Sequence, residues 1–104
     1  MTLDRDLQSI QEVRDLVANA KKAQRELAEF SQEKIDRIIY EIAKDCAANA
    51  QKLAKMAVEE TGFGVWEDKV LKNLLGSTIT YESCKDMKTV GVIKEDKAAG
   101  LIEV

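Results

Sequence analysis

The stretch ETGFGVWEDKV, residues 60–70, decides how the rest of this chain is arranged. It follows an apolar helical run, and a glycine just past a helix end, here Gly62, can take the left-handed conformation that closes the helix. Gly64 gives the chain a second point at which to turn. Two carboxylates then fall in the first turn of the next helix, where they suit the positive end of its dipole. The stretch therefore predicts a helix–helix corner, with Phe63 and Trp66 filling its core.

Helical patterns lie on both sides of this corner. Ser9 opens a capping-box pattern, which predicts a first helix over residues 9–30. Ser31 is the next capping residue, and apolar side chains recur at helical spacing over 32–61 and again over 65–84. The predicted fold class is therefore mainly α, with three helices followed by a β-hairpin.

The hairpin is predicted because the sequence period changes after Lys88. The runs TVGVI, residues 89–93, and LIEV, residues 101–104, are β-prone, and the polar segment between them ends in glycine. These runs place the two strands near 88–94 and 99–104. A two-stranded hairpin alone is marginal in water, so we expect it to need a partner sheet. Since the sequence also stops on an apolar strand residue, we expect the chain to be part of a longer polypeptide.

Four aliphatic residues of the predicted strands form a candidate oligomer interface: Val90, Val92, Leu101 and Ile102. The helices can cover only one face of a two-stranded sheet. The outer strand edges also leave backbone donors and acceptors unpaired, which favours the addition of another strand. We therefore expect a homo-oligomer that forms through the hairpin.

Length and charge limit the classes of function. A chain of 104 residues is one domain at most, here a single partial domain 1–104 with a helical region over 9–84 and the hairpin over 88–104. A net charge of −3 and a pI near 5.0 argue against nucleic-acid binding. No apolar run approaches membrane-spanning length, and the acidic N-terminal residues lack the apolar core of a signal peptide. We expect a cytoplasmic protein with neither nucleic acid nor membrane as partner.

Few residues offer chemistry. The chain has no histidine, which removes the commonest general base and a common zinc ligand. Cys46 lies on an apolar helical stripe and is interpreted as a buried structural thiol. Cys84 lies near a helix end, but nothing around it is typical of an acyl-transfer site. Lys69, Lys72 and Asn73 lie close together, either as a surface charge network or as contacts to a phosphate or carboxylate. No catalytic, cofactor-binding or metal-binding residue is predicted.

Three segments together carry a resemblance to a known family. They are KAQRE (residues 22–26), the corner stretch at 60–70, and KDMKTVGVI (residues 85–93). In order and spacing they resemble the N-terminal part of a CoA-acylating aldehyde dehydrogenase. Enzymes of this kind include the aldehyde-dehydrogenase halves of bifunctional aldehyde–alcohol dehydrogenases, and the succinate-semialdehyde dehydrogenases that acylate CoA. The resemblance runs from about residue 16 to residue 104 and implies the N-terminal part of the aldehyde dehydrogenase fold.

The resemblance also implies a reaction for the complete enzyme. In this family a cysteine thiolate attacks the aldehyde, a hydride passes to NAD(P)+, and the resulting thioester is transferred to CoA. Both the catalytic cysteine and the dinucleotide-binding unit of the family lie beyond Val104. Residues 62–64, GFG, lack the third glycine and follow a helix, so they are not a phosphate cradle. The chain alone is therefore expected to bind neither NAD(P) nor CoA. The matching hairpin of the family joins subunits.

Three hypotheses for function follow. In the first, the chain is the N-terminal fragment of an NAD(P)-dependent, CoA-acylating aldehyde dehydrogenase, inactive alone and packed against the remainder of the dehydrogenase domain. In the second, it is a stand-alone helical interaction module that associates through its hairpin. In the third, it is a small enzyme that uses Cys84, which the surrounding residues do not support.

Overall fold

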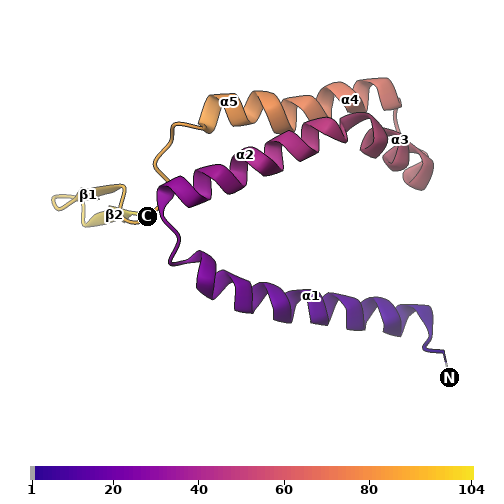
Figure 1. Ribbon diagram of the computed structural model, residues 1–104, viewed down its shortest axis with the longest axis horizontal. Coiled ribbons are helices and arrows are strands. Elements are labelled where there is room, and N and C mark those ends of the chain that lie inside the picture. Colours follow the sequence, from indigo (N-terminus) through magenta and orange to yellow (C-terminus); the bar gives the residue numbers. More distant parts are fainter. Residues whose placement is uncertain (1) are drawn as a thin grey trace. The chain divides into compact units, whose positions relative to one another are not determined.

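The computed structural model describes residues 2–104 and confirms a mainly helical fold that ends in a two-stranded hairpin (Figure 1). The chain divides into two compact units, one ending at Phe30 and the other comprising Ser31–Val104. Within residues 2–104, no helix is both long and apolar enough to cross a membrane.

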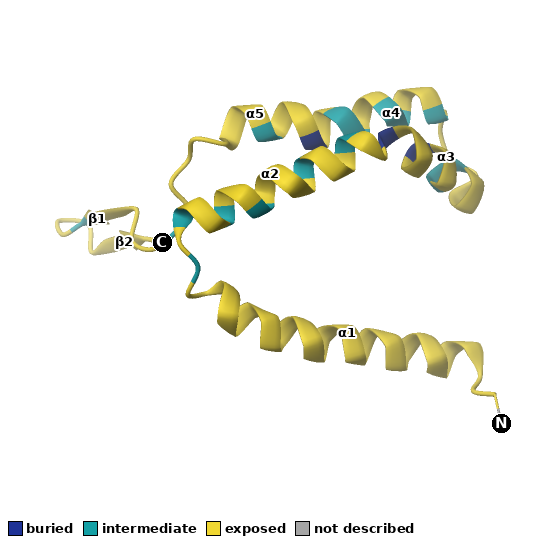
Figure 2. Cartoon of the chain, in the orientation of Figure 1, coloured by how far each residue is buried: buried dark blue, intermediate teal, exposed yellow. Residues whose placement is uncertain are grey.

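The first unit is one helix, α1 (Arg5–Leu27). It begins four residues before the predicted start at Ser9, because the extended residue Asp4 already accepts a hydrogen bond from the Gln8 N–H at 2.9 Å. The capping box at Ser9 is therefore not used, and that prediction is wrong. None of the helical residues of α1 is buried within the unit (Figure 2).

The second predicted helix is two helices, α2 (Gln32–Ala48) and α3 (Ala50–Thr61). Its predicted start is confirmed, since the Ser31 hydroxyl accepts a hydrogen bond from the Lys34 N–H. The predicted continuity is wrong. Asn49 leaves helical geometry at φ −102° and ψ 9°, and its side chain donates to the Asp45 carbonyl at 2.8 Å. An asparagine that bonds to nearby backbone competes with the helix in this way.

The corner at residues 60–70 is confirmed in its backbone. Gly62 is left-handed, at φ 69°, and donates its N–H to the Val58 carbonyl at 2.8 Å, which closes α3. α4 (Trp66–Leu74) follows. Trp66 is half-buried, with the Lys55 ammonium 4.5 Å from the centroid of its ring. Phe63 is 77% exposed, so its predicted place in the core is wrong for this chain.

The third predicted helix is unbroken but changes its winding. After α4 the chain continues as a π-helical segment, η1 (Leu75–Ile79), and then as α5 (Thr80–Cys84). The Thr80 N–H and its hydroxyl both bond to the Leu75 carbonyl, five residues back, as the wider turn requires. In the second unit, α3 packs on α4 while α2 runs beside η1 and α5 (Figure 1).

The packed centre of the second unit is small. Its buried apolar residues are Ala50 and Ala54, which are 3% and 1% exposed, and both belong to α3, the helix that packs on α4 (Figure 2). Ser77 is the buried polar residue, and its hydroxyl donates to the Asn73 carbonyl at 2.7 Å. Small side chains at this crossing let the two helix backbones approach each other.

The hairpin is confirmed, but its first strand lies later than predicted. β1 (Lys94–Asp96) pairs antiparallel with β2 (Leu101–Glu103), with Glu95 opposite Ile102. The range 88–94 is therefore wrong for this strand: residues 89–93 are neither helix nor strand, although the Ile93 N–H already bonds to the Glu103 carbonyl at 2.8 Å. A left-handed glycine, Gly91 at φ 77°, interrupts the extended run.

Candidate functional site

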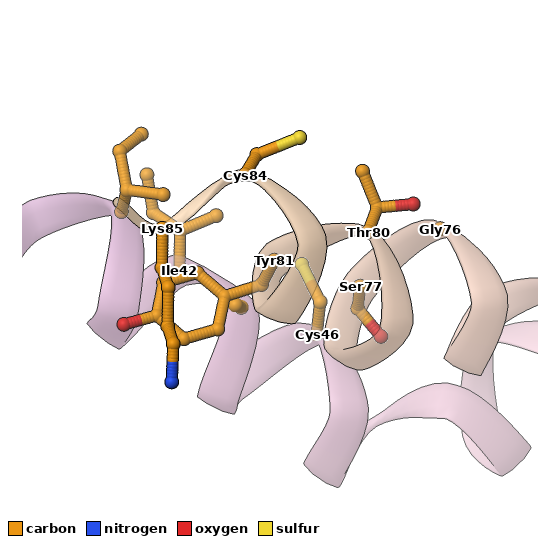
Figure 3. A pocket seen from close by; sticks show the side chains of 10 residues that line it. Ile42, Cys46, Gly76, Ser77, Thr80, Tyr81, Cys84 and Lys85 are labelled. Atoms are coloured by element: carbon orange, nitrogen blue, oxygen red, sulfur yellow. The ribbon is translucent and has the colours of Figure 1, made fainter. Parts of the chain in front are cut away.

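An apolar groove lies between α2 and the helical segment formed by η1 and α5 (Figure 3). Its volume is about 220 Å³. The ring of Tyr81, which lines the groove, meets the ring of Tyr40 at a centroid distance of 5.9 Å and an interplanar angle of 59°. The lining residues are Ile39, Ile42, Ala43, Cys46, Gly76, Ser77, Thr80, Tyr81, Cys84 and Lys85.

Both cysteines line this groove as free thiols, Cys46 from α2 and Cys84 from α5 (Figure 3). Cys46 is exposed, so the interpretation of a buried structural thiol is wrong for this chain. The sulfur of Cys84 lies 3.5 Å from the Ser83 hydroxyl, which is a neutral group and not a base. The Ser77 and Thr80 hydroxyls donate to backbone carbonyls of their own helix. Together these contacts define a packing surface, and they do not activate a nucleophile.

Lys85, which lines the groove, has a raised pKa. The Lys85 ammonium donates a hydrogen bond to the Glu82 carboxylate at 2.9 Å, and this bond, aided by the charge attraction, raises the pKa of Lys85 above its ordinary value. Both side chains are substantially exposed, so the pair is a surface ion pair of modest strength. Among residues 2–104, no group of three or more acidic or cysteine side chains is arranged to hold a metal ion.

The cluster of Lys69, Lys72 and Asn73 does not converge on one point. The Asn73 amide donates to the Ala50 carbonyl at 2.9 Å, which ties α4 to the start of α3. Lys69 turns toward the corner, where its side chain lies 3.0 Å from the position that a Cβ would take on Gly64. Asn73 therefore has a structural role, which sequence spacing alone did not show because Ala50 is 23 residues away.

The four predicted interface residues lie on two different kinds of structure. Leu101 and Ile102 are in β2 and point to opposite faces of the hairpin, since side chains alternate along a strand. Val90 and Val92 precede β1; Val90 is half-buried, whereas Val92 is exposed. The structure thus brings these residues into one short segment but does not gather them on one face.

Sequence reasoning missed a fifth residue, Gln32. It is the first residue of α2, and its side chain bonds to the backbone of Thr89 and Val90, which are 57 and 58 residues away. No local pattern marks such a contact, because a glutamine after a capping serine is an ordinary start of a helix.

The helices, the corner and the terminal hairpin together match the opening segment of a known enzyme class. An acetylating aldehyde dehydrogenase from Geobacillus thermoglucosidasius superposes on 93% of the chain with a TM-score of 0.81 and 50% sequence identity. The chain is homologous to the N-terminal part of the CoA-acylating aldehyde dehydrogenases, which confirms the resemblance seen in its sequence. No protein-family model matches the chain.

Individual relatives agree with this assignment. The bifunctional aldehyde-alcohol dehydrogenase AdhE of Escherichia coli (strain K12) is 46% identical over 96 residues, which are 92% of this chain and 11% of that protein. The succinate-semialdehyde dehydrogenase (acetylating) of Clostridium kluyveri is 44% identical over 92 residues, which are 88% of this chain and 20% of that protein. The Geobacillus structure is likewise covered to 22% of its length. The chain therefore spans a small opening part of each relative.

Proposed function

We propose that the chain serves as the N-terminal structural segment of a CoA-acylating aldehyde dehydrogenase. The complete enzyme would convert an aldehyde, CoA and NAD(P)+ into acyl-CoA, NAD(P)H and a proton, in the cytoplasm. The observation that carries this proposal is the 50% identity and TM-score of 0.81 to an acetylating aldehyde dehydrogenase over 93% of the chain.

The segment would contribute packing surfaces and no chemistry. In the complete reaction a cysteine thiolate adds to the aldehyde carbon, a hydride leaves that carbon for NAD(P)+, and the CoA thiol then displaces the enzyme thiolate from the thioester. Neither Cys46 nor Cys84 would supply that thiolate, since both lie in an apolar groove formed by helix packing. NAD(P) and CoA would bind to the remainder of the enzyme and not to this chain alone.

A row of exposed aliphatic side chains supports a structural role. Leu71, Leu75 and Ile79 follow one another at intervals of four residues along α4 and η1, and all three are exposed. Side chains at this spacing lie on one side of an α-helix, although the π-turn widens the row. Such a row is typical of a helix that another element covers. In our proposal the remainder of the dehydrogenase domain covers it.

A segment exchange tests the proposal. The 96 aligned residues of the Escherichia coli enzyme are replaced by the corresponding residues of this chain, and NADH formation from acetaldehyde, CoA and NAD+ is measured. We expect the chimera to retain acylating activity, and we expect the same chimera carrying Leu71→Glu and Leu75→Glu to lose it.

The isolated chain serves as the control for folding. Because both leucines are exposed, the double substitution should leave the helix content of the isolated chain unchanged by circular dichroism. An inactive chimera that is folded and soluble would contradict the proposal. Turnover by the isolated 104-residue chain that is abolished by Cys84→Ser would instead support a small enzyme that uses Cys84.

We further propose that the chain associates with copies of itself through the hairpin. Leu101 and Ile102 are 62% and 61% exposed on opposite faces of a sheet that has only two strands. Both outer edges of that sheet are open to another strand. The same surface would serve the alternative function, a stand-alone helical module that docks through its hairpin.

A further inference from the structure

One side chain joins the start of α2 to the segment that leads to the hairpin. Oε1 of Gln32 accepts hydrogen bonds from the backbone N–H groups of Thr89 at 2.8 Å and Val90 at 3.0 Å. Its Nε2 donates to the Thr89 hydroxyl at 2.9 Å and to the Asp36 carboxylate, one turn along α2, at 2.8 Å. The amide therefore uses both its acceptor and its donor group on the segment that leads to the hairpin, and Asp36 holds it in place.

The hairpin itself is not packed on the helices. Among the described residues, β1 and β2 contact each other and neither strand lies against a helix. The connecting segment bends at the left-handed Gly91, where the Lys88 ammonium also donates to the Val92 carbonyl at 3.1 Å. The direction in which the hairpin leaves the helices thus depends on the residues just before this bend, which are the two residues that Gln32 holds.

We propose that Gln32 is a latch that fixes the hairpin in position relative to α2. With the latch closed, the backbone of Thr89 and Val90 is fixed and the hairpin points in one direction. With the latch open, Gly91 and its neighbours let the hairpin swing as an independent body. The inference rests on the proposed function in one respect only: a fixed direction presents the hairpin to a partner strand already oriented, which lowers the ordering cost of association.

Two substitutions of Gln32 test the latch. Gln32→Met keeps the size of the side chain and removes all four hydrogen bonds. Gln32→Glu, made together with Asp36→Asn so that an amide and not a second carboxylate faces the new side chain, keeps the acceptor for both N–H groups, and a carboxylate suits the first turn of α2. We expect amide hydrogen exchange at Thr89 and Val90 to accelerate about tenfold in Gln32→Met and to stay slow in Gln32→Glu, given the usual strength of such bonds.

A second readout reports on the hairpin itself. In Gln32→Met, ¹⁵N relaxation should show the strands β1 and β2 moving independently of α2, whereas Gln32→Glu should keep them moving with the helices. Gln11→Ala is the matched control, because Gln11 makes the same bond to a carboxylate four residues on, to Asp15 at 2.8 Å, but lies in the first unit. It should change neither readout.

The latch is separable from the association proposal. Both readouts are taken at a dilution where the chain is monomeric, so a failure to associate leaves them interpretable. If Gln32→Met loses helix content, Thr89→Val replaces it, since it removes only the hydroxyl that Nε2 contacts and should accelerate exchange at Thr89 to a smaller extent. Unchanged exchange at Thr89 and Val90 in the folded Gln32→Met variant would overturn the proposal.

Discussion

Gly62 and Gly76 show how backbone conformation alone decides the effect of a substitution. A Cβ added at either position meets no atom within 4 Å, but Gly62 has φ 69° whereas Gly76 lies inside a helix without a positive φ. We expect Gly62→Ala to lower the free energy of unfolding by about 1–2 kcal/mol. Gly76→Ala should raise it by up to about 1 kcal/mol. Urea titration followed by circular dichroism measures both, and equal effects would contradict the role of Gly62 as a helix cap.

Lys85 provides a prediction about pH. Its pKa lies above the ordinary value of 10.5 because of the hydrogen bond to Glu82 and the charge attraction that accompanies it. The contribution of the pair to stability through Lys85 is therefore complete below about pH 10.5 and declines as the pH rises through the pKa of the folded state.

The measurement is an NMR titration of the Lys85 side chain. Glu82→Gln should bring its pKa back toward 10.5, since the substitution removes the carboxylate that accepts the hydrogen bond and attracts the ammonium charge. The control is Glu41→Gln, which removes a separate ion pair, with Lys44 at 3.9 Å, and should leave the pKa of Lys85 unchanged. If the pKa of Lys85 were the same in Glu82→Gln as in the original chain, the hydrogen bond to Glu82 would not be the cause of the raised pKa.

At the scale of elements, the crossing of α3 and α4 is the most sensitive to side-chain size. Ala54 is 1% exposed there, so a larger side chain has no free space. We expect Ala54→Leu to lower the free energy of unfolding by about 1–3 kcal/mol, as is usual for overpacking. Ala48→Leu, at an exposed position of α2, should change it little. Thermal unfolding of the two variants would show the difference, and equal melting temperatures would count against close packing at this crossing.

The corner at residues 60–70 was predictable because its signals are local. A glycine after an apolar helical run and two carboxylates in the next turn act within a few residues of one another, and the left-handed Gly62 confirms them. The break at Asn49 was not predictable in the same way. A single asparagine weakens a helix without ending it, and the sequence shows neither its side-chain bond to the Asp45 carbonyl nor the close packing of Ala50 and Ala54 that follows it.

The predicted position of the first strand was wrong for a related reason. Residues 89–93 have strand-like composition, but two of their N–H groups donate to Gln32, and Gly91 takes a positive φ. A contact across 57 residues thus overrides local β propensity. At the site, the sequence placed Leu101 and Ile102 correctly in the hairpin but not Val90 and Val92, and it gave no sign of the apolar groove or of Gln32.

At the scale of the whole molecule, association through the hairpin is open to a direct test. Covering the three exposed aliphatic side chains of Val92, Leu101 and Ile102 would contribute on the order of 4–9 kcal/mol before association costs. We expect light scattering to give a multiple of the monomer mass for the intact chain. Val92→Lys and a form ending at Lys88 should be monomeric.

The control for this test is Val13→Lys. Val13 in α1 is 57% exposed, close to the 54% of Val92, but lies outside the hairpin. It should leave the mass of the intact chain unchanged. If the intact chain and both hairpin variants all had the monomer mass, the proposal that the chain associates through its hairpin would be wrong.

The small packed centre around Ala50 and Ala54 has a consequence for the response to temperature. The heat-capacity step of unfolding grows with the apolar surface that unfolding exposes to water. In residues 31–104 most large aliphatic side chains are already in water in the folded state, so this step is small for each residue. The stability of this unit alone therefore follows a shallow curve that changes little on cooling. If a partner buried the same side chains, unfolding would expose more apolar surface and its heat-capacity change would be larger. Calorimetry would therefore detect the partner as a larger heat-capacity step and a more strongly curved stability profile.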